Sequence, residues 1–413
     1  MKVAVRWTFF LLVIVALTGL LMRALPLLPN IGIPLDTLRH AHSHLAFLGW
    51  VYSAFYLALV YFLLPVGSFQ APRYQQLFRL TQMVSMGMFA AFLWQGYGAI
   101  SIAFLTFHTL LAYAFFFFFI KDWKRENRHP STWFGLVAIG AFFLSSLGPF
   151  AIPVVQVVGG GSPFWMRMAI HFYLHFHYNG WFVFALLAVF FKILENSGAS
   201  FSPALARLQW WLMAVSLLPA YFLYAPAAGR IDPASPILLA TAWAQWLGVA
   251  LFVFQFFKMK WASKLGGTNV SRFLLYFSLD FLFLKSTCEL LGAQPLLASY
   301  FERNNHFLTI GYLHLLFLGS VTPFVWWFSV REGWVEAKKP TVLVGILLFV
   351  AGFVGSEACL LAMGLEWGMP YFPQLMLGFT LLLVGGIVLF SSAFFSKTTK
   401  GIFPARESAS VGT

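Results

Sequence analysis

The stretch RHAHSHLAFLGWV (residues 39–51) places three histidines, His40, His42 and His44, directly before a long apolar run. The run continues to residue 64, which makes it long enough to cross a bilayer as a helix. Histidine is costly to bury in hydrocarbon, and ionisable side chains inside membrane helices commonly mark functional sites. The stretch therefore predicts a membrane-spanning helix that carries a functional group at one end.

The rest of the chain has the same apolar character. Of its 413 residues, 60% are hydrophobic and only 9% are charged, a composition that is not typical of soluble domains. We predict an all-α polytopic membrane protein in which one transmembrane domain covers residues 1–396 and a disordered cytoplasmic tail covers residues 397–413. The twelve predicted spans are residues 6–28, 41–64, 78–97, 99–120, 132–151, 166–192, 207–225, 236–257, 271–292, 304–329, 340–362 and 371–395.

The net charge of +13 follows from topology and does not require a nucleic-acid partner. If the N-terminus is cytoplasmic, most lysines and arginines fall in inner loops, where they face anionic lipid. This distribution predicts that both termini are cytoplasmic and that membrane lipid is the main partner. The basic residues of the outer segments are Arg23, Arg39, Arg167, Arg230 and Arg303.

Two later segments repeat the pattern of the first one. They are RMAIHFYLHFHYNGWFV (residues 167–183) and NNHFLTIGYLHLLFLGSV (residues 304–321). HLAFLGWV, which begins at His44, matches HLLFLGSV, which begins at His314, and His177 lies about midway between them. We predict three pseudo-symmetric four-helix units, about 1–130, 131–265 and 266–396, each with histidine near the outer end of its second helix.

The spacing of the histidines predicts more than one site. Imidazole is a common ligand of haem iron, copper and zinc. His171 and His175 are four residues apart and share a helix face. His175 and His177 are two residues apart and point about 200° apart, and His42 and His44 have the same relation. One metal cannot easily use both members of such a pair, so we expect sites on two sides of a helix.

A structural interpretation competes with metal binding for single histidines. A lone histidine at a helix end is more commonly an interfacial or hydrogen-bonded residue. This interpretation applies to His108 and His129, and it remains open for His40. Three clusters at matched depth on related helices instead favour haem or metal binding.

One motif resembles a known family. HFHYNGWFVFAL (residues 175–186) is similar to the HFHY helix of haem–copper oxidases, in which two histidines face two haems. The twelve-helix plan also looks like subunit I of that superfamily, which includes bacterial nitric oxide reductases. HAHSHLAF (residues 40–47) and HFLTIGYLH (residues 306–314) look like histidine segments of the NnrS family of haem- and copper-containing membrane proteins. Both resemblances imply the cytoplasmic membrane of a bacterium.

The chain also departs from the oxidase pattern. Its HFHY motif lies on the sixth predicted helix, whereas the family carries it on the tenth. The seventh predicted helix, RLQWWLMAVSLLPAYFLYA (residues 207–225), has no histidine, although the family takes two copper ligands from it. The resemblance therefore implies haem more strongly than it implies copper.

The resemblance assigns roles to individual residues. It implies a haem, most simply of b type, ligated by His44 and His314, with His42 as the alternative ligand on the same helix and His177 as a ligand of a second haem or a metal. His171 and His175 are candidates for copper or a second haem, and His306 is an alternative ligand or a residue that supports one. The arginines that precede the three histidine helices would pair with haem propionates, although interfacial snorkelling explains them equally well; they are Arg39, Arg167 and Arg303.

Charged residues inside the predicted spans suggest a proton relay. Lys285 and Glu289 are four residues apart on one helix and are expected to pair. Glu289, Glu357 and the phenol of Tyr178 are the candidate relay groups. The alternative is that Lys285 and Glu289 form a neutralised structural pair.

These patterns leave three functions open. The first is redox chemistry on dioxygen or nitric oxide at a haem beside a second metal, with electrons from a c-type cytochrome or a quinol and with small accessory subunits. The second is a non-catalytic haem or nitric-oxide-responsive protein of the NnrS type. The third is a transporter for a transition metal, which fits histidines and acidic residues inside a membrane.

Overall fold

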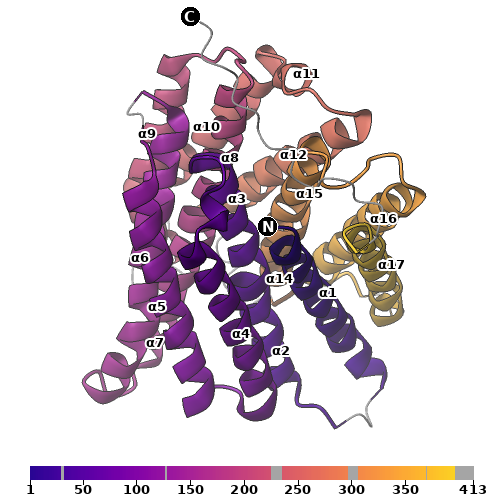
Figure 1. Cartoon of the computed structure of the whole chain (residues 1–413). Coiled ribbons are helices and arrows are strands. Elements are labelled where there is room, and N and C mark those ends of the chain that lie inside the picture. The colour runs from indigo at the N-terminus through magenta and orange to yellow at the C-terminus, as the bar shows by residue number, and fades with distance from the viewer. Residues whose placement is uncertain (29–31, 126–127, 225–234, 296–305, 369, 396–413) are drawn as a thin grey trace, which may run out of the picture. The chain divides into compact units, whose positions relative to one another are not determined.

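A computed structural model describes residues 1–28, 32–125, 128–224, 235–295, 306–368 and 370–395. Within these residues every regular element is a helix, and no strand occurs (Figure 1). This confirms the all-α prediction for the described part of the chain. The predicted tail and Arg303 lie outside the described residues.

The helices follow the predicted spans closely. The α-helices are α1 (Lys2–Ala24), α2 (Leu35–His44), α3 (Tyr52–Leu63), α4 (Pro72–Gln95), α5 (Ala99–Asp122), α6 (Pro130–Val157), α7 (Pro163–His175), α8 (Val183–Asn196), α9 (Pro203–Ala220), α10 (Pro236–Lys258), α11 (Trp261–Lys264), α12 (Asn269–Gly292), α14 (His306–His314), α15 (Thr322–Arg331), α16 (Pro340–Gly364) and α17 (Phe372–Ser392). Short 3-10 helices are η1 (Leu25–Leu27), η4 (Ser68–Gln70) and η6 (Tyr221–Tyr224).

Ten helical stretches of the described chain are long and apolar enough to cross a membrane, and they indicate a multi-pass membrane protein. They are Lys2–Leu27, Leu35–Leu63, Pro72–Gln95, Ala99–Asp122, Pro130–Val157, Pro163–Asn196, Pro236–Lys258, His306–Arg331, Pro340–Gly364 and Phe372–Ser392. The seventh and ninth predicted spans correspond to α9 and α12, which are helical but fall outside these ten. Twelve spans and two cytoplasmic termini therefore stay predictions.

Packing divides the chain into two compact units. Unit 1 comprises Met1–Lys124, Gly267–Leu274 and Val325–Thr413, and unit 2 comprises Arg125–Gly266 and Leu275–Phe324. In unit 1, α17 packs against both α1 and α16 (Figure 1). In unit 2, α6 packs against α7 and α8, and α9 packs against α10. The three four-helix repeats stay a prediction.

Glycines allow the closest of these helix contacts. A Cβ atom at Gly352 of α16 would overlap the backbone nitrogen of Leu383, and one at Gly386 of α17 would overlap that of Phe349. Small residues of this kind let helix backbones approach closely in membrane proteins, where packing rather than water exclusion drives association. The α16–α17 pair is therefore built for tight packing.

Three histidines stand where an α-helix changes into a seven-residue π-helix. α2 ends at His44 before η3 (Leu45–Val51), α7 ends at His175 before η5 (Phe176–Phe182), and α14 ends at His314 before η8 (Leu315–Val321). Each π-helix has glycine at its fifth position, namely Gly49, Gly180 and Gly319. Local conformation therefore aligns His175, two residues before His177, with His44 and His314. π-helices are rare and are frequent at functional sites.

Side chains stabilise the carbonyl groups of these π-helices. The ring nitrogen Nε2 of His108 lies 2.9 Å from the carbonyl oxygen of Leu48 in η3. In η8, the Ser278 hydroxyl donates to the carbonyl of Ser320 at 2.8 Å. His108 is thus a buried hydrogen-bonded residue, as the structural interpretation predicted.

Candidate functional site

His42 is anchored to α1 through one ring nitrogen. Its Nδ1 lies 3.0 Å from the carbonyl oxygen of Val15 and 3.1 Å from the Thr18 hydroxyl. A carbonyl oxygen only accepts hydrogen bonds, so Nδ1 carries the proton and Nε2 carries the lone pair. Gly19 makes room for the ring, because a Cβ atom there would lie 3.2 Å from Cε1 of His42.

His44 has the same tautomer but faces other elements. Its Nδ1 donates to the carbonyl oxygen of His40 at 2.9 Å, and its ring stacks on Phe92 with centroids 4.2 Å apart. The Tyr97 hydroxyl, 3.2 Å away, donates to Nε2. His40 also contacts Tyr97, with ring centroids 4.6 Å apart. The spacing predictions are confirmed here, since His40 and His44 share a side while His42 faces α1.

His177 repeats this arrangement in unit 2. The Ser145 hydroxyl donates its only proton to the carbonyl oxygen of Phe142 at 2.7 Å. It must therefore accept from Nδ1 of His177, 3.2 Å away, which leaves the lone pair on Nε2. The His177 side chain is almost fully buried, with 1% of its surface exposed.

His175 is held in the opposite tautomer. Its Nε2 donates to the carbonyl oxygen of Leu217 at 2.8 Å. This oxygen is available because the chain tightens after α9, where the N–H of Tyr221 bonds to the carbonyl of Leu218 instead. Nδ1 then accepts from the side-chain amide of Asn179 at 3.3 Å. The lone pair of His175 is therefore on Nδ1 and faces the Asn179 amide, whereas the lone pairs of His42, His44 and His177 are on Nε2.

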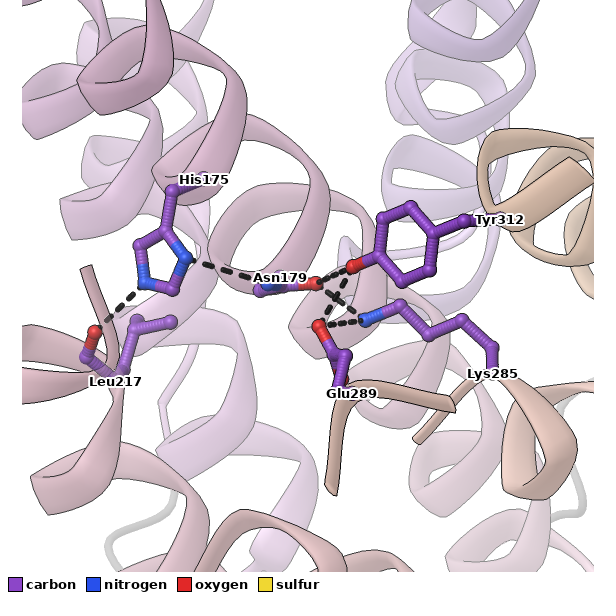
Figure 2. A network of polar contacts seen from close by, with 6 residues as sticks. All are labelled: His175, Asn179, Leu217, Lys285, Glu289 and Tyr312. Carbon is purple, nitrogen blue, oxygen red and sulfur yellow. Dashed lines mark hydrogen bonds and ion pairs between the residues drawn. The ribbon is translucent and has the colours of Figure 1, made fainter. Parts of the chain in front are cut away.

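The Asn179 amide connects His175 to a buried ion pair, as Figure 2 shows. The Asn179 Oδ1 atom accepts from Nζ of Lys285 and from the Tyr312 hydroxyl, the latter at 3.4 Å. Glu289 Oε1 accepts from Nζ of Lys285 at 2.9 Å and from the Tyr312 hydroxyl at 2.6 Å. Lys285 is only 3% exposed. We call these five side chains the polar network.

The polar network contains one predicted pair and one residue that the sequence did not reveal. The pairing of Lys285 with Glu289 is confirmed. The phenol in the network belongs to Tyr312 of α14, whereas the predicted Tyr178 packs against Phe317 with ring centroids 5.4 Å apart. The proximity of Tyr312 to His314 in the sequence was the available signal. His175 and His177 face different helices, α9 and α6, as predicted.

The remaining histidine candidates are not arranged around one metal position in the described residues. His171 stacks on Tyr221, with ring centroids 5.7 Å apart, and lies 5.9 Å from the ring of His175. His306 is exposed at the start of α14, and His314 is half-buried at its end. In the part of the chain that the structure describes, no group of three or more His, Cys, Asp or Glu side chains is arranged for a metal ion. The copper ligands stay predictions.

The predicted arginines and Glu357 lie in different settings. Arg39 pairs with Asp36 at 2.9 Å, and both side chains are exposed. Arg167 is exposed on α7. Glu357 of α16 is within electrostatic reach of Arg23 at the end of α1, and both belong to unit 1. Propionate binding and a relay that includes Glu357 stay predictions.

Comparison with known proteins does not assign this chain to a family. No protein-family model matches it, and no curated protein matches its sequence. The resemblances to haem–copper oxidases and to the NnrS family therefore rest on the three histidine segments.

Proposed function

We propose that this protein is a multi-pass membrane haem protein whose iron ligands are drawn from His42, His44 and His177. The supporting observation is their shared tautomer, in which Nδ1 donates to a carbonyl or hydroxyl oxygen and Nε2 carries the lone pair. Metal-ligating histidines typically have this second hydrogen bond, which fixes the ring orientation and raises the basicity of the ligating nitrogen.

The surroundings of these histidines suit an apolar cofactor. Phe92 stacks on His44, and Phe182 contacts His177 with ring centroids 4.7 Å apart. Such side chains exclude water from a ligated iron, and haem, when bound, supplies reversible electron or gas-ligand chemistry. His314, which matches His44 in the sequence repeat, remains a further proposed haem ligand. The oxidase resemblance favours reaction of dioxygen or nitric oxide at a b-type haem, with electrons supplied by a cytochrome c or a quinol.

A specific observation favours a second candidate, a non-catalytic haem or nitric-oxide-responsive protein. His175 corresponds to His44 in its place before a π-helix, but its lone pair is on Nδ1 and accepts from the Asn179 amide of the polar network. A second metal at His171 and His175 would have to displace the Asn179 amide from Nδ1 of His175. Haem binding without a second metal would leave this contact in place.

The deciding experiment is an optical spectrum of the purified protein, oxidised and dithionite-reduced, with and without carbon monoxide, beside a count of iron, copper and zinc. We expect the split bands of a histidine-ligated haem. A carbon monoxide shift with one copper per chain supports redox catalysis, whereas haem without either supports the non-catalytic candidate. A protein that lacks haem after expression with ample haem supply contradicts both, and the transition-metal transporter then becomes the leading hypothesis.

A further inference from the structure

A small cavity of about 30 Å³ lies beside the polar network in unit 2. Its polar wall is formed by Asn179, Gln245, Lys285, Ser286 and Glu289, and apolar side chains of α8, α9, α10 and α12 complete it. A buried water needs roughly 10–15 Å³ of such space and two to four polar partners. The cavity therefore has the size and the lining for about two waters.

Glu289 offers the cavity an unused acceptor. Within the described residues, the hydrogen bonds that Lys285 and Tyr312 donate to Glu289 both end on Oε1. The Oε2 atom is left as an acceptor for water, and the side chain is 18% exposed. A carboxylate that is fixed by one oxygen and hydrated through the other can exchange a proton without losing its position.

The ion pair itself calls for an explanation other than stability. Removing two charges from water costs several kcal/mol per ion, and a buried pair commonly does no better than apolar residues of the same shape. Ionisable groups inside membrane helices are therefore functional candidates. The groups that face Glu289 are Lys285 on its own helix, Tyr312 from α14 and, through Asn179, His175 at the end of α7.

We propose that this cavity is a hydrated proton-binding site in which the carboxylate of Glu289 is the proton acceptor. A hydronium ion in the cavity breaks one of its O–H bonds as an O–H bond forms at Oε2, which leaves a carboxylic acid and a water molecule. Lys285 keeps its ammonium charge on Asn179, and Tyr312 keeps its proton on Oε1. The net charge of the site changes from zero to plus one, and release reverses the step.

Ser286 and Gln245 have a separate role in this proposal. They line the cavity, while the hydrogen bonds that the described residues make to the ion pair come from Asn179 and Tyr312. Ser286 and Gln245 hold the water that brings the proton. Ser286→Val would fill part of the cavity, and Gln245→Leu would remove its amide, while both leave Lys285 and Glu289 paired. These variants separate proton delivery from the stability of the polar network.

The test is infrared difference spectroscopy of the full-length protein after a pH step, in light and in heavy water. We expect one carboxylic acid band that appears at acid pH and shifts in heavy water, and that is absent from Glu289→Gln. Glu195→Gln serves as the control, because Glu195 is a buried glutamate held by Ser131 and His129 away from the cavity. The carboxylic acid band that appears at acid pH in this variant is expected to match that of the wild type.

Exchange rates provide the second measurement, which remains informative if Glu289→Gln does not fold. Deuterium exchange of the carboxyl band should slow at least about tenfold in Ser286→Val and Gln245→Leu. The proposal is overturned if the wild-type protein shows no titrating carboxyl band. It is also overturned if exchange in both cavity variants is as fast as in the wild type. The readout does not depend on haem, so failure here and failure of the haem proposal are distinguishable.

Discussion

His44 and His175 occupy the same place in the local backbone and yet have opposite chemistry. Each ends an α-helix and precedes a seven-residue π-helix with glycine at the fifth position. His44 donates from Nδ1 to a carbonyl of its own helix, whereas His175 donates from Nε2 to Leu217 of α9. The comparison teaches that the partner carbonyl, and not the backbone motif, decides which nitrogen can bind a metal.

The difference has an identifiable physical cause. The carbonyl four residues before His44 belongs to His40 and accepts its proton. The helix end at α9 instead leaves the Leu217 carbonyl available to His175, and the Asn179 amide then occupies Nδ1. His175 is thereby tied to a charged pair, while His44 is tied to neutral partners. The predictions below test this contrast.

The largest expected effect concerns the ion pair of Lys285 and Glu289, to which His175 is linked. Lys285→Met should destabilise the protein by about 3–5 kcal/mol, because it leaves Glu289 as an uncompensated buried charge. The double variant Lys285→Met/Glu289→Leu removes both charges and should recover most of that loss. Denaturant unfolding in detergent measures both. A double variant as unstable as the single one would show that the ion pair contributes stability of its own.

The second prediction separates the two histidines by haem content. His44→Ala should lower the affinity for haem by about a hundredfold, since even the hydrogen-bond partners of metal ligands contribute about 10–100-fold. His175→Ala should leave the haem-to-protein ratio within about twofold of wild type, because its lone pair is on Nδ1 and faces the Asn179 amide of the polar network. Haem titration of purified variants, followed by absorbance, is the measurement. Equal losses in both variants would contradict the assignment by tautomer.

The sequence predicted those features of the site that depend on helix geometry alone. Helical spacing correctly paired Lys285 with Glu289 and correctly placed His175 and His177 on different sides. The spacing did not reveal Tyr312 or Leu217, because each joins the site through contact between helices distant in sequence. Hydrophobic runs likewise located the helices. They did not reveal the π-helices, whose backbone shift aligns His175 with His44.

The third prediction concerns the glycines of two π-helices. A Cβ atom at Gly180 would overlap the Cβ atom of Ala141, which cannot move aside, so Gly180→Ala should cost about 1–3 kcal/mol of stability. A Cβ atom at Gly49 would meet the tip of Leu45 at 2.8 Å, and that side chain can rotate. Gly49→Ala should therefore cost less than about 1 kcal/mol. If thermal unfolding shows equal losses of stability in the two variants, glycine is needed for the π-helix backbone itself and not for space against neighbouring side chains.

The smallest expected effect tests whether Tyr97 competes for Nε2 of His44. Tyr97→Phe removes the hydroxyl that donates to this nitrogen, while the ring contact with His40 can remain. Loss of one hydrogen bond should cost no more than about 0.5–1.5 kcal/mol of stability. Haem affinity should stay equal or rise, because the ligating nitrogen no longer gives up a hydrogen bond when it binds iron. A fall in haem affinity would instead mean that the phenol supports the bound haem, and His44 would then resemble His175 in needing both of its partners.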